Sequence, residues 1–142
     1  SSRRTSAAVE RLLIERLGKH PRCRMLILAS RDELDGTMDG MLGAATVAVV
    51  TGESVSMVSE ACASGRRVVV VEPPLRHANR ATLTKHQRFL RELAADGYLR
   101  LAPVPEVGHA LRAALKEARP SKRLDNFTAV RSAVEHLLPV SR

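Results

Sequence analysis

The residues best suited to chemistry lie in one short stretch, Thr51-Gly52-Glu53-Ser54-Val55-Ser56, between an apolar run and a helical pattern. The stretch is therefore a predicted strand-to-helix corner. In parallel sheets, ligands bind beyond the carboxyl ends of the strands, where helix N-termini expose free N–H groups and a positive dipole end. Gly52 lets the backbone turn or approach a ligand closely. The hydroxyls of Ser54 and Ser56 add groups suited to phosphate oxygens, so this corner predicts a phosphate site that begins at Thr51.

Glu60 follows this corner and carries a different chemistry. It lies four residues after Ser56 and six after Ser54, whereas a capping box requires a spacing of three. On a helix it faces roughly the same side as Ser56, where its carboxylate could accept hydrogen bonds from two ribose hydroxyls. A second interpretation stays open. The two serines would then be an N-cap and its neighbour, and Glu60 would pair on the surface with Arg66 or Arg67.

A second polar turn, Ser2-Arg3-Arg4-Thr5, precedes another helical pattern. Guanidinium groups match the geometry of phosphate bidentately. If both turns lie at the same edge of a sheet, we expect them to hold a diphosphate together. The alternative is that Arg3 and Arg4 are ordinary solvated charges.

The composition favours a globular protein with anionic partners. The chain has 142 residues, 44% of them apolar, and a net charge of +8; four of its 23 basic residues are lysine and the other 19 are arginine. The bases are scattered and aromatics make up only 2%, which argues against nucleic acid, since bases stack on aromatic side chains. A basic module for nucleic acid or a membrane surface is a third hypothesis, and peripheral membrane contact stays open.

The sequence also predicts the compartment and the absence of metal. It has neither a run of about 20 apolar residues nor a hydrophobic leader, which predicts a cytoplasmic protein without a membrane span. Cys23 and Cys62 lack metal-ligand spacing and indicate a reducing compartment, with both thiols in the core. The histidines at 77, 86 and 109 have no partner at ligand spacing, so we expect no metal site and no cofactor.

Helical and strand patterns alternate along the chain. Short apolar runs predict buried parallel strands at 25–29, 46–50 and 68–71, and a fourth strand at 98–101. Helical spacing predicts helices over 9–17, 34–42, 55–63, 83–94, 107–118 and 127–138, the last behind a cap at Asp125 or Asn126. This order predicts an α/β class, a Rossmann-like parallel sheet with helices on both faces, in a single domain over residues 1–142. Because a helix stands first, we expect a C-terminal fragment that lacks its first strand and an N-terminal domain.

These motifs carry a family resemblance. The Ser-Arg-Arg-Thr turn, the segment Val50–Ala61, Gly65 before a valine-rich strand, and Lys85-His86-Gln87-Arg88-Phe89 together resemble the mitochondrial-fission "elongated mitochondria" family over nearly the whole chain. The family usually shows Thr-Ala-Asp-Ser where this chain has Thr51-Gly52-Glu53-Ser54. More distantly, the pattern is similar to the C-terminal half of GT-B glycosyltransferases, which binds a nucleotide-diphosphate-sugar.

The resemblance implies roles for particular residues. Glu60 would hold the ribose, Ser54 and Ser56 would lie near the diphosphate, and the turn at residues 2–5 would be the second phosphate contact. The loop 75–84 would border the sugar, with Lys85 or His86 as its polar group. The candidate ligand-binding residues are thus Ser2, Arg3, Arg4, Thr5, Thr51, Gly52, Ser54, Ser56, Glu60 and Lys85.

Two functions follow from the resemblance. The first is a nucleotide-sugar-binding domain of a glycosyltransferase-like protein, with the base and acceptor site in the expected N-terminal part; whether it is catalytic stays open. The alternative is a non-catalytic adaptor that recruits a dynamin-like partner, as the plant members of the family imply.

Overall fold

The computed structural model describes residues 1, 5–32, 35–72, 84–118, 121–125, 128, 131 and 134. They belong to two compact units, Ser1–Thr37 and Met38–Arg142. The prediction that residues 1–142 form one domain stays a prediction. No helix within the described ranges combines the length and the apolarity that crossing a membrane requires.

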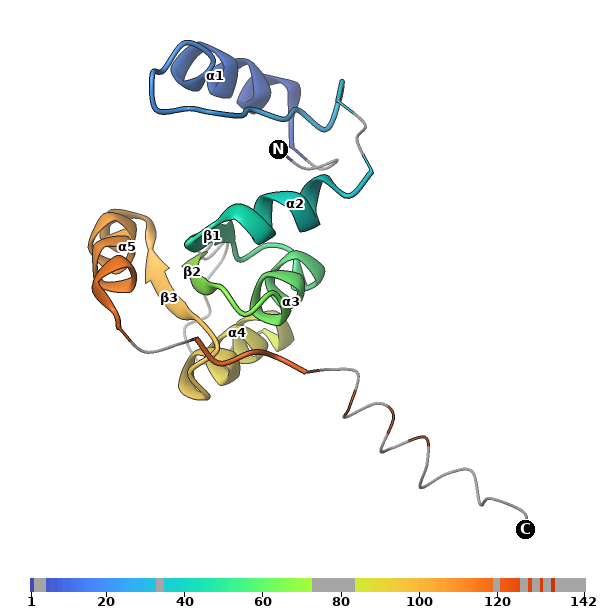
Figure 1. Ribbon diagram of the computed structural model, residues 1–142, viewed down its shortest axis with the longest axis vertical. Coiled ribbons are helices and arrows are strands. Elements are labelled where there is room, and N and C mark those ends of the chain that lie inside the picture. Colours follow the sequence, from blue (N-terminus) through green and yellow to red (C-terminus); the bar gives the residue numbers. More distant parts are fainter. Residues whose placement is uncertain are drawn as a thin grey trace. The chain divides into compact units, whose positions relative to one another are not determined.

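The second unit is built on a parallel sheet of three strands. β1 (Val47–Thr51), β2 (Arg67–Glu72) and β3 (Arg100–Pro103) follow one another in the order β1-β2-β3 (Figure 1). Val49 lies opposite Val69 in the first pair, and Val71 lies opposite Ala102 in the second. Runs of β-branched valine favour such strands. The predicted α/β class with a Rossmann-like parallel sheet is confirmed.

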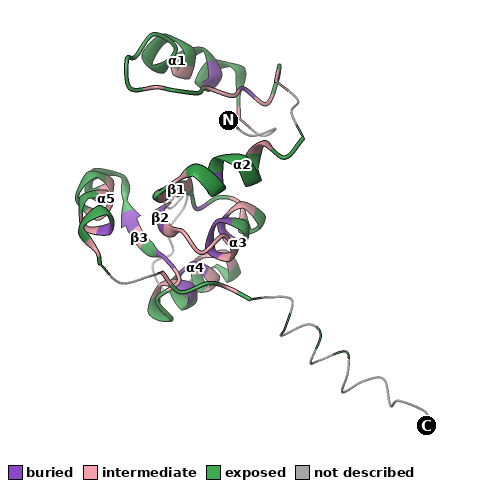
Figure 2. Ribbon diagram, viewed as in Figure 1, coloured by how far each residue is buried: buried purple, intermediate pink, exposed green. Residues whose placement is uncertain are grey.

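Helices cover both faces of this sheet. α3 (Val55–Ala63) and α4 (Lys85–Ala95) lie on one face, and α5 (Val107–Lys116), which follows the short 3-10 turn Val104–Glu106, lies on the other (Figure 1). The buried side chains on the α3–α4 face include Val58, Cys62, Val68, Val70, Leu90 and Leu93. Those on the α5 face are Val69, Ala102 and Ala114. β2 is thus covered on both sides, and Figure 2 shows buried stretches on the neighbouring α3 and β3.

α2 (Thr37–Ala44) contributes Leu42 to the core of the second unit. It begins three residues later than predicted and ends two later. The third and fourth predicted strands are confirmed with shifted bounds, since β2 extends by one residue at each end and β3 begins only at Arg100. The tertiary hydrogen-bond partners set these ends, which the apolar runs alone leave open.

An extended segment, Ser121–Asp125, closes the C-terminal end of α3. The hydroxyl of Ser121 donates to the Gly65 carbonyl, Arg123 Nε donates to the Ala63 carbonyl at 2.8 Å, and the Leu124 N–H donates to the Cys62 carbonyl at 3.1 Å. The donors from Arg123 and Leu124 satisfy carbonyls that the last turn of a helix leaves without partners, and the one from Ser121 binds just beyond the helix end.

Asp125 starts the last predicted helix in the way that the sequence indicates. Its carboxylate accepts from the Thr128 N–H at 3.0 Å and from the Thr128 hydroxyl at 2.7 Å. The residues described beyond it, Thr128, Arg131 and Val134, are helical. The rest of the helix predicted over 127–138 lies outside the described residues.

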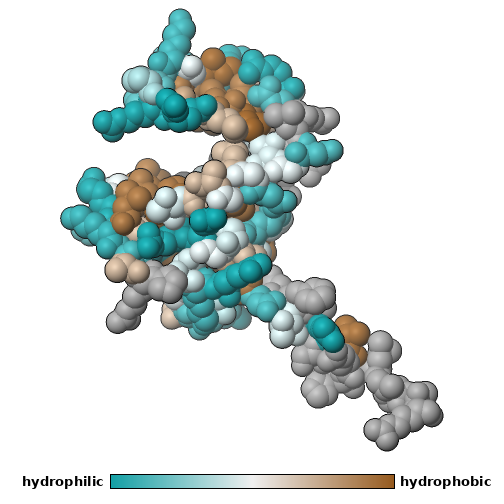
Figure 3. All heavy atoms as spheres, in the orientation of Figure 1, coloured by the Kyte–Doolittle hydropathy of each residue, from teal (hydrophilic) through white to brown (hydrophobic). Residues whose placement is uncertain are grey.

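The first unit contains one helix, α1 (Ala7–Leu17), within its described part. The Ser6 hydroxyl accepts from the Val9 N–H at 3.4 Å, and Gly18 is the C-cap; the helix predicted over 9–17 is thus confirmed, with a start two residues earlier. The apolar side chains of α1 stay largely exposed within this unit, and its buried residue is Glu10. Figure 3 shows these hydrophobic side chains at the surface of the unit.

The strand predicted over Met25–Ala29 is wrong. These residues have no regular secondary structure apart from a turn that begins at Ala29. Their backbone groups bind side chains and local turns, as in the Ala29 N–H donating to Ser1 Oγ at 2.8 Å and the Leu28 N–H donating to Asp32 Oδ2 at 3.0 Å. An apolar run becomes a strand only where a neighbouring strand takes its backbone hydrogen bonds, and no strand among the described residues pairs with this run.

Candidate functional site

The predicted corner lies where β1 passes into α3. Thr51 is the last, exposed residue of β1, and Gly52 is buried directly after it. The Gly52 N–H donates to the Val71 carbonyl of β2 at 2.9 Å, and the Gly52 carbonyl is in hydrogen-bond contact with His86 Nε2 of α4. Because the Gly52 N–H already donates to β2, it is not available to bind a ligand. The backbone donors that remain for a ligand therefore come from the residues after Gly52.

Ser54 is the N-cap of α3. Its hydroxyl accepts from the Met57 N–H at 3.4 Å, and its carbonyl accepts from the Val58 N–H at 3.1 Å. The capping role that the sequence left open for Ser54 is thus observed. Among the described residues, the N–H groups of Val55 and Ser56 have no hydrogen-bond partner. They are donors of the first helical turn, at the positive end of the α3 dipole.

Ser56 and Glu60 form a pair on the outer side of α3. The Ser56 hydroxyl donates to Glu60 Oε1 at 2.7 Å, and both side chains are exposed. Helical spacing places them opposite Val58 and Ala61, which face the core. The ion pair with an arginine that the sequence left open is not formed, because the described ion pairs do not include Glu60.

Arg66 and Arg67, the two cations that the sequence offered as partners of Glu60, lie elsewhere. Arg66 donates through Nη2 to the Gly43 carbonyl at 2.7 Å. Arg67 is the first residue of β2, and its Nε is buried without a hydrogen-bond partner among the described residues. The exposed Glu60 carboxylate is consequently held by a hydroxyl at Oε1, and no described residue is hydrogen-bonded to Oε2.

The start of α4 lies at the same corner. Thr84 closes a capping box, in which its hydroxyl accepts from the Gln87 N–H at 3.2 Å and its N–H donates to Gln87 Oε1 at 2.9 Å. Lys85 follows as the first helical residue and is exposed, and His86 is half-buried against Gly52. The tertiary structure therefore brings Lys85 and His86 to the corner that Thr51–Ser56 forms. The other residues of the loop expected to border the sugar, 75–83, lie outside the described residues.

The second predicted turn is not placed. Ser2, Arg3 and Arg4 lie outside the described residues, and Thr5, which is half-buried, belongs to the first compact unit. That this turn meets the Ser54–Glu60 corner around a diphosphate stays a prediction.

Comparison with known families decides the identity of the chain. The sequence profile of the mitochondrial fission ELM1 family matches residues 1–136. The chain belongs to this family. Comparison with curated proteins and with solved structures gave no match. Membership confirms the family resemblance of the motifs, whereas the likeness to GT-B glycosyltransferases stays a prediction.

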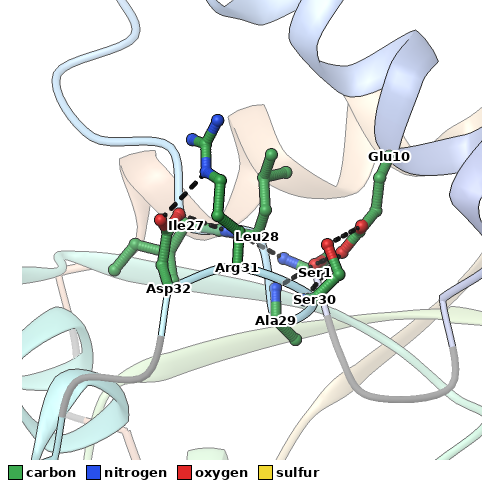
Figure 4. A network of polar contacts seen from close by, with 8 residues as sticks. All are labelled: Ser1, Glu10, Ile27, Leu28, Ala29, Ser30, Arg31 and Asp32. Atoms are coloured by element: carbon green, nitrogen blue, oxygen red, sulfur yellow. Dashed lines mark hydrogen bonds and ion pairs between the residues drawn. The ribbon is translucent and has the colours of Figure 1, made fainter.

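The ELM1-family chain also contains a polar network that sequence reasoning missed (Figure 4). Its centre is Glu10, whose side chain is buried although the residue carries a charge. Glu10 Oε1 accepts from the Ser1 hydroxyl at 2.6 Å and from the Ser30 N–H at 3.4 Å, and Oε2 accepts from the Ser30 hydroxyl. The hydrogen bond from Ser1, followed by those from Ser30, holds the pKa of the Glu10 carboxyl below its usual range.

Asp32 completes this network on the other side of the turn. It accepts from the Leu28 N–H at 3.0 Å and pairs with Arg31, whose Nε lies 3.2 Å from Oδ1. The Leu28 hydrogen bond is the first cause that lowers the pKa of Asp32, and the bond from Arg31 is the second. The sequence feature that could have indicated this network is Ser30, which directly follows an apolar run, as Thr51 and its neighbours follow another. Within the described ranges, no group of three or more His, Cys, Asp or Glu side chains is arranged to hold a metal.

Proposed function

We propose that this ELM1-family chain is the nucleotide-diphosphate-sugar-binding part of a GT-B glycosyltransferase-like protein. The observation that carries the proposal is the Glu60 carboxylate, held by Ser56 at 2.7 Å on an exposed helical face close to the strand-to-helix corner. A carboxylate only accepts hydrogen bonds, and the two hydroxyls of a ribose can donate them together. Ser56 restricts the rotamer of Glu60 while Oε2 stays open.

The diphosphate would lie at the N-terminus of α3. The N–H groups of Val55 and Ser56 are the backbone donors there, and the helix dipole favours negative charge at that end. Glu60 lies four positions after Ser56 on the helix, which corresponds to an axial rise of about 6 Å. A ribose is bonded to its diphosphate through a single carbon, so the two parts of one ligand span a distance of that order.

Lys85 would supply the positive side chain. It is exposed at the start of α4, and the contact between His86 and Gly52 holds that start against the corner. In glycosyl transfer, negative charge develops on the departing diphosphate. Fixed N–H donors and an ammonium group stabilise such charge without reorganisation at the moment of reaction. Donor binding and leaving-group stabilisation are the roles that we assign to this corner.

An adaptor that recruits a dynamin-like partner is the second candidate, and the family match favours it. Some features of the corner also suit a purely structural role, because Gly52 is bound at both backbone groups and Ser54 serves as a cap. The two functions differ in their requirement for Glu60. An adaptor has no use for a carboxylate that complements a ribose.

A thermal-shift panel of UDP-, GDP-, ADP- and CMP-linked sugars tests the proposal. A ligand at about 100 times its dissociation constant adds about 2.7 kcal/mol, which raises the melting temperature of a domain of this size by several degrees. We expect one nucleotide class to shift the wild-type chain and the shift to disappear in Glu60→Ala. Glu92→Ala, which removes an exposed carboxylate from α4, is the matched control and should keep the shift.

The outcomes separate the two candidates. The absence of a shift with every nucleotide sugar removes the glycosyltransferase-like function and leaves the adaptor. A shift that persists undiminished in Glu60→Ala removes Glu60 from the site while it retains the nucleotide.

A further inference from the structure

We infer that His86 is a positioning residue for the corner between β1 and α3, which it holds in the shape that binds the nucleotide sugar. The inference rests on the proposed function and adds to it a residue that need not touch the ligand. Its basis is the contact between His86 Nε2 and the Gly52 carbonyl, which joins residues 34 positions apart in the chain.

The chemistry of this contact fixes the proton on the ring. A carbonyl oxygen only accepts, so the Nε2 atom of His86 must carry a hydrogen and donate it. Gly52 is buried, and its N–H already donates to the Val71 carbonyl at 2.9 Å. The peptide groups on both sides of Gly52 therefore have fixed orientations, one set by β2 and the other set by His86.

α4 is a firm support for the ring. The Thr84 capping box fixes the first turn of the helix, and His86 is its second residue. Leu90 lies one turn later on the same side and is 1% exposed in the core beneath. Because the ring stands on an anchored helical turn, its hydrogen bond restrains the corner more than a contact from a free loop would.

The restraint acts on the donors that would meet the ligand. Gly52 and Glu53 lead directly to Ser54, whose hydroxyl caps α3, and then to the N–H groups of Val55 and Ser56. Without the donor of His86, the buried Gly52 carbonyl loses its partner and the peptide group after Gly52 is free to rotate. The direction in which the following N–H groups point would then vary, and anion binding would weaken.

The experiment compares His86→Leu with His86→Gln. Glutamine carries an N–H donor at a reach comparable to that of Nε2, whereas leucine carries none. His109→Leu is the matched control, since His109 is exposed on α5. Two quantities are measured on the full chain at a temperature where every variant is folded. They are the dissociation constant for the same panel of UDP-, GDP-, ADP- and CMP-linked sugars and hydrogen exchange in the peptide covering residues 52–57 without ligand.

We expect His86→Leu to weaken nucleotide-sugar binding and to accelerate exchange in the 52–57 peptide, each on the order of tenfold, the factor of one lost hydrogen bond. His86→Gln should restore both quantities toward the wild-type values, and His109→Leu should change neither. Rescue by glutamine separates positioning through the hydrogen bond from simple loss of packing.

Three results would overturn the inference. Unchanged exchange in His86→Leu would show that the hydrogen bond does not restrain the corner, whatever the ligand does. Accelerated exchange with unchanged affinity would show that the corner shape is not what the ligand requires. If the wild-type chain binds no nucleotide sugar, the proposed function fails, and the inferred role of His86 in ligand binding fails as well.

Discussion

Raising the pH from 8 to 10 should weaken the fold through the thiol of Cys62. This side chain is 0% exposed, in the core between α3 and the sheet. Burial raises the pKa of the Cys62 thiol from 9.0 to about 11, because an apolar environment disfavours the charged thiolate. The folded protein therefore holds its proton at a pH where the unfolded chain releases it.

The size of the effect follows from this difference. The stabilisation is complete below about pH 9 and is lost as the pH rises from 9 toward 11, because the folded state binds more protons in that range. One pKa unit corresponds to about 1.4 kcal/mol, so the free energy of unfolding should fall by about that amount by pH 10. The loss should level off at about 2.7 kcal/mol above pH 11.

Urea unfolding of the wild type and Cys62→Ala at pH 8 and pH 10 measures this effect. Removal of the thiol removes its titration, so the midpoint should drop further in the wild type than in the variant by about 0.5–1.4 M. The packing loss in Cys62→Ala is common to both pH values and cancels. Cys23→Ala, which removes a half-buried thiol, is the matched control and should keep the wild-type pH dependence.

Parallel losses of stability in the wild type and Cys62→Ala between pH 8 and pH 10 would refute the reasoning. The alkaline sensitivity would then belong to other groups that titrate in this range, and the Cys62 thiolate would find stabilisation in the folded state.

Further predictions concern the supports of the fold. Glu10→Gln should lower the urea midpoint at pH 7, because the partners of Glu10 donate hydrogen bonds to a carboxylate. The variant should also lose less stability than the wild type when the pH falls below the ordinary carboxyl pKa. Equal acid sensitivity of variant and wild type would contradict this. Arg123→Ala should cost roughly 0.5–1.5 kcal/mol, because the Ala63 carbonyl loses its donor, and chemical denaturation should detect that loss. Thr84→Ala should cost about 1 kcal/mol by removal of the α4 cap, whereas Thr84→Ser should be close to neutral.

The pattern of apolar residues was sufficient to predict the sheet and most of the helices that cover it. Two valine-rich runs and the helical spacing around them indicated parallel strands, because a strand covered on both faces reads as a continuous apolar run. The same pattern was misleading at Met25–Ala29, where the backbone hydrogen bonds go to side chains and turns. Apolarity reports burial, and pairing depends on a neighbour that a local pattern does not contain.

The candidate site likewise combines features that local spacing predicts with contacts that only the fold creates. The capping role of Ser54 and the shared face of Ser56 and Glu60 depend on spacings of three and four residues, which a helix fixes by its own geometry. The contact of His86 with Gly52 joins two segments separated by 34 positions, so no local pattern contains it. The buried position of Glu10 is likewise invisible to a rule that places carboxylates at the surface.

The sequence by itself determined most elements of the second unit, the fold class, the family and the residue types at the corner, since each of these follows from short-range periodicity or a contiguous motif. Only the tertiary structure decided which elements meet at that corner, that Arg66 binds the Gly43 carbonyl while Glu60 stays with Ser56, and that the Ser121–Asp125 segment closes α3. The physical reason is that a hydrogen bond between distant segments forms only after packing has brought a donor and an acceptor together. The chemistry of a side chain limits which groups it can bind, and the fold determines which of those groups lie within hydrogen-bond distance.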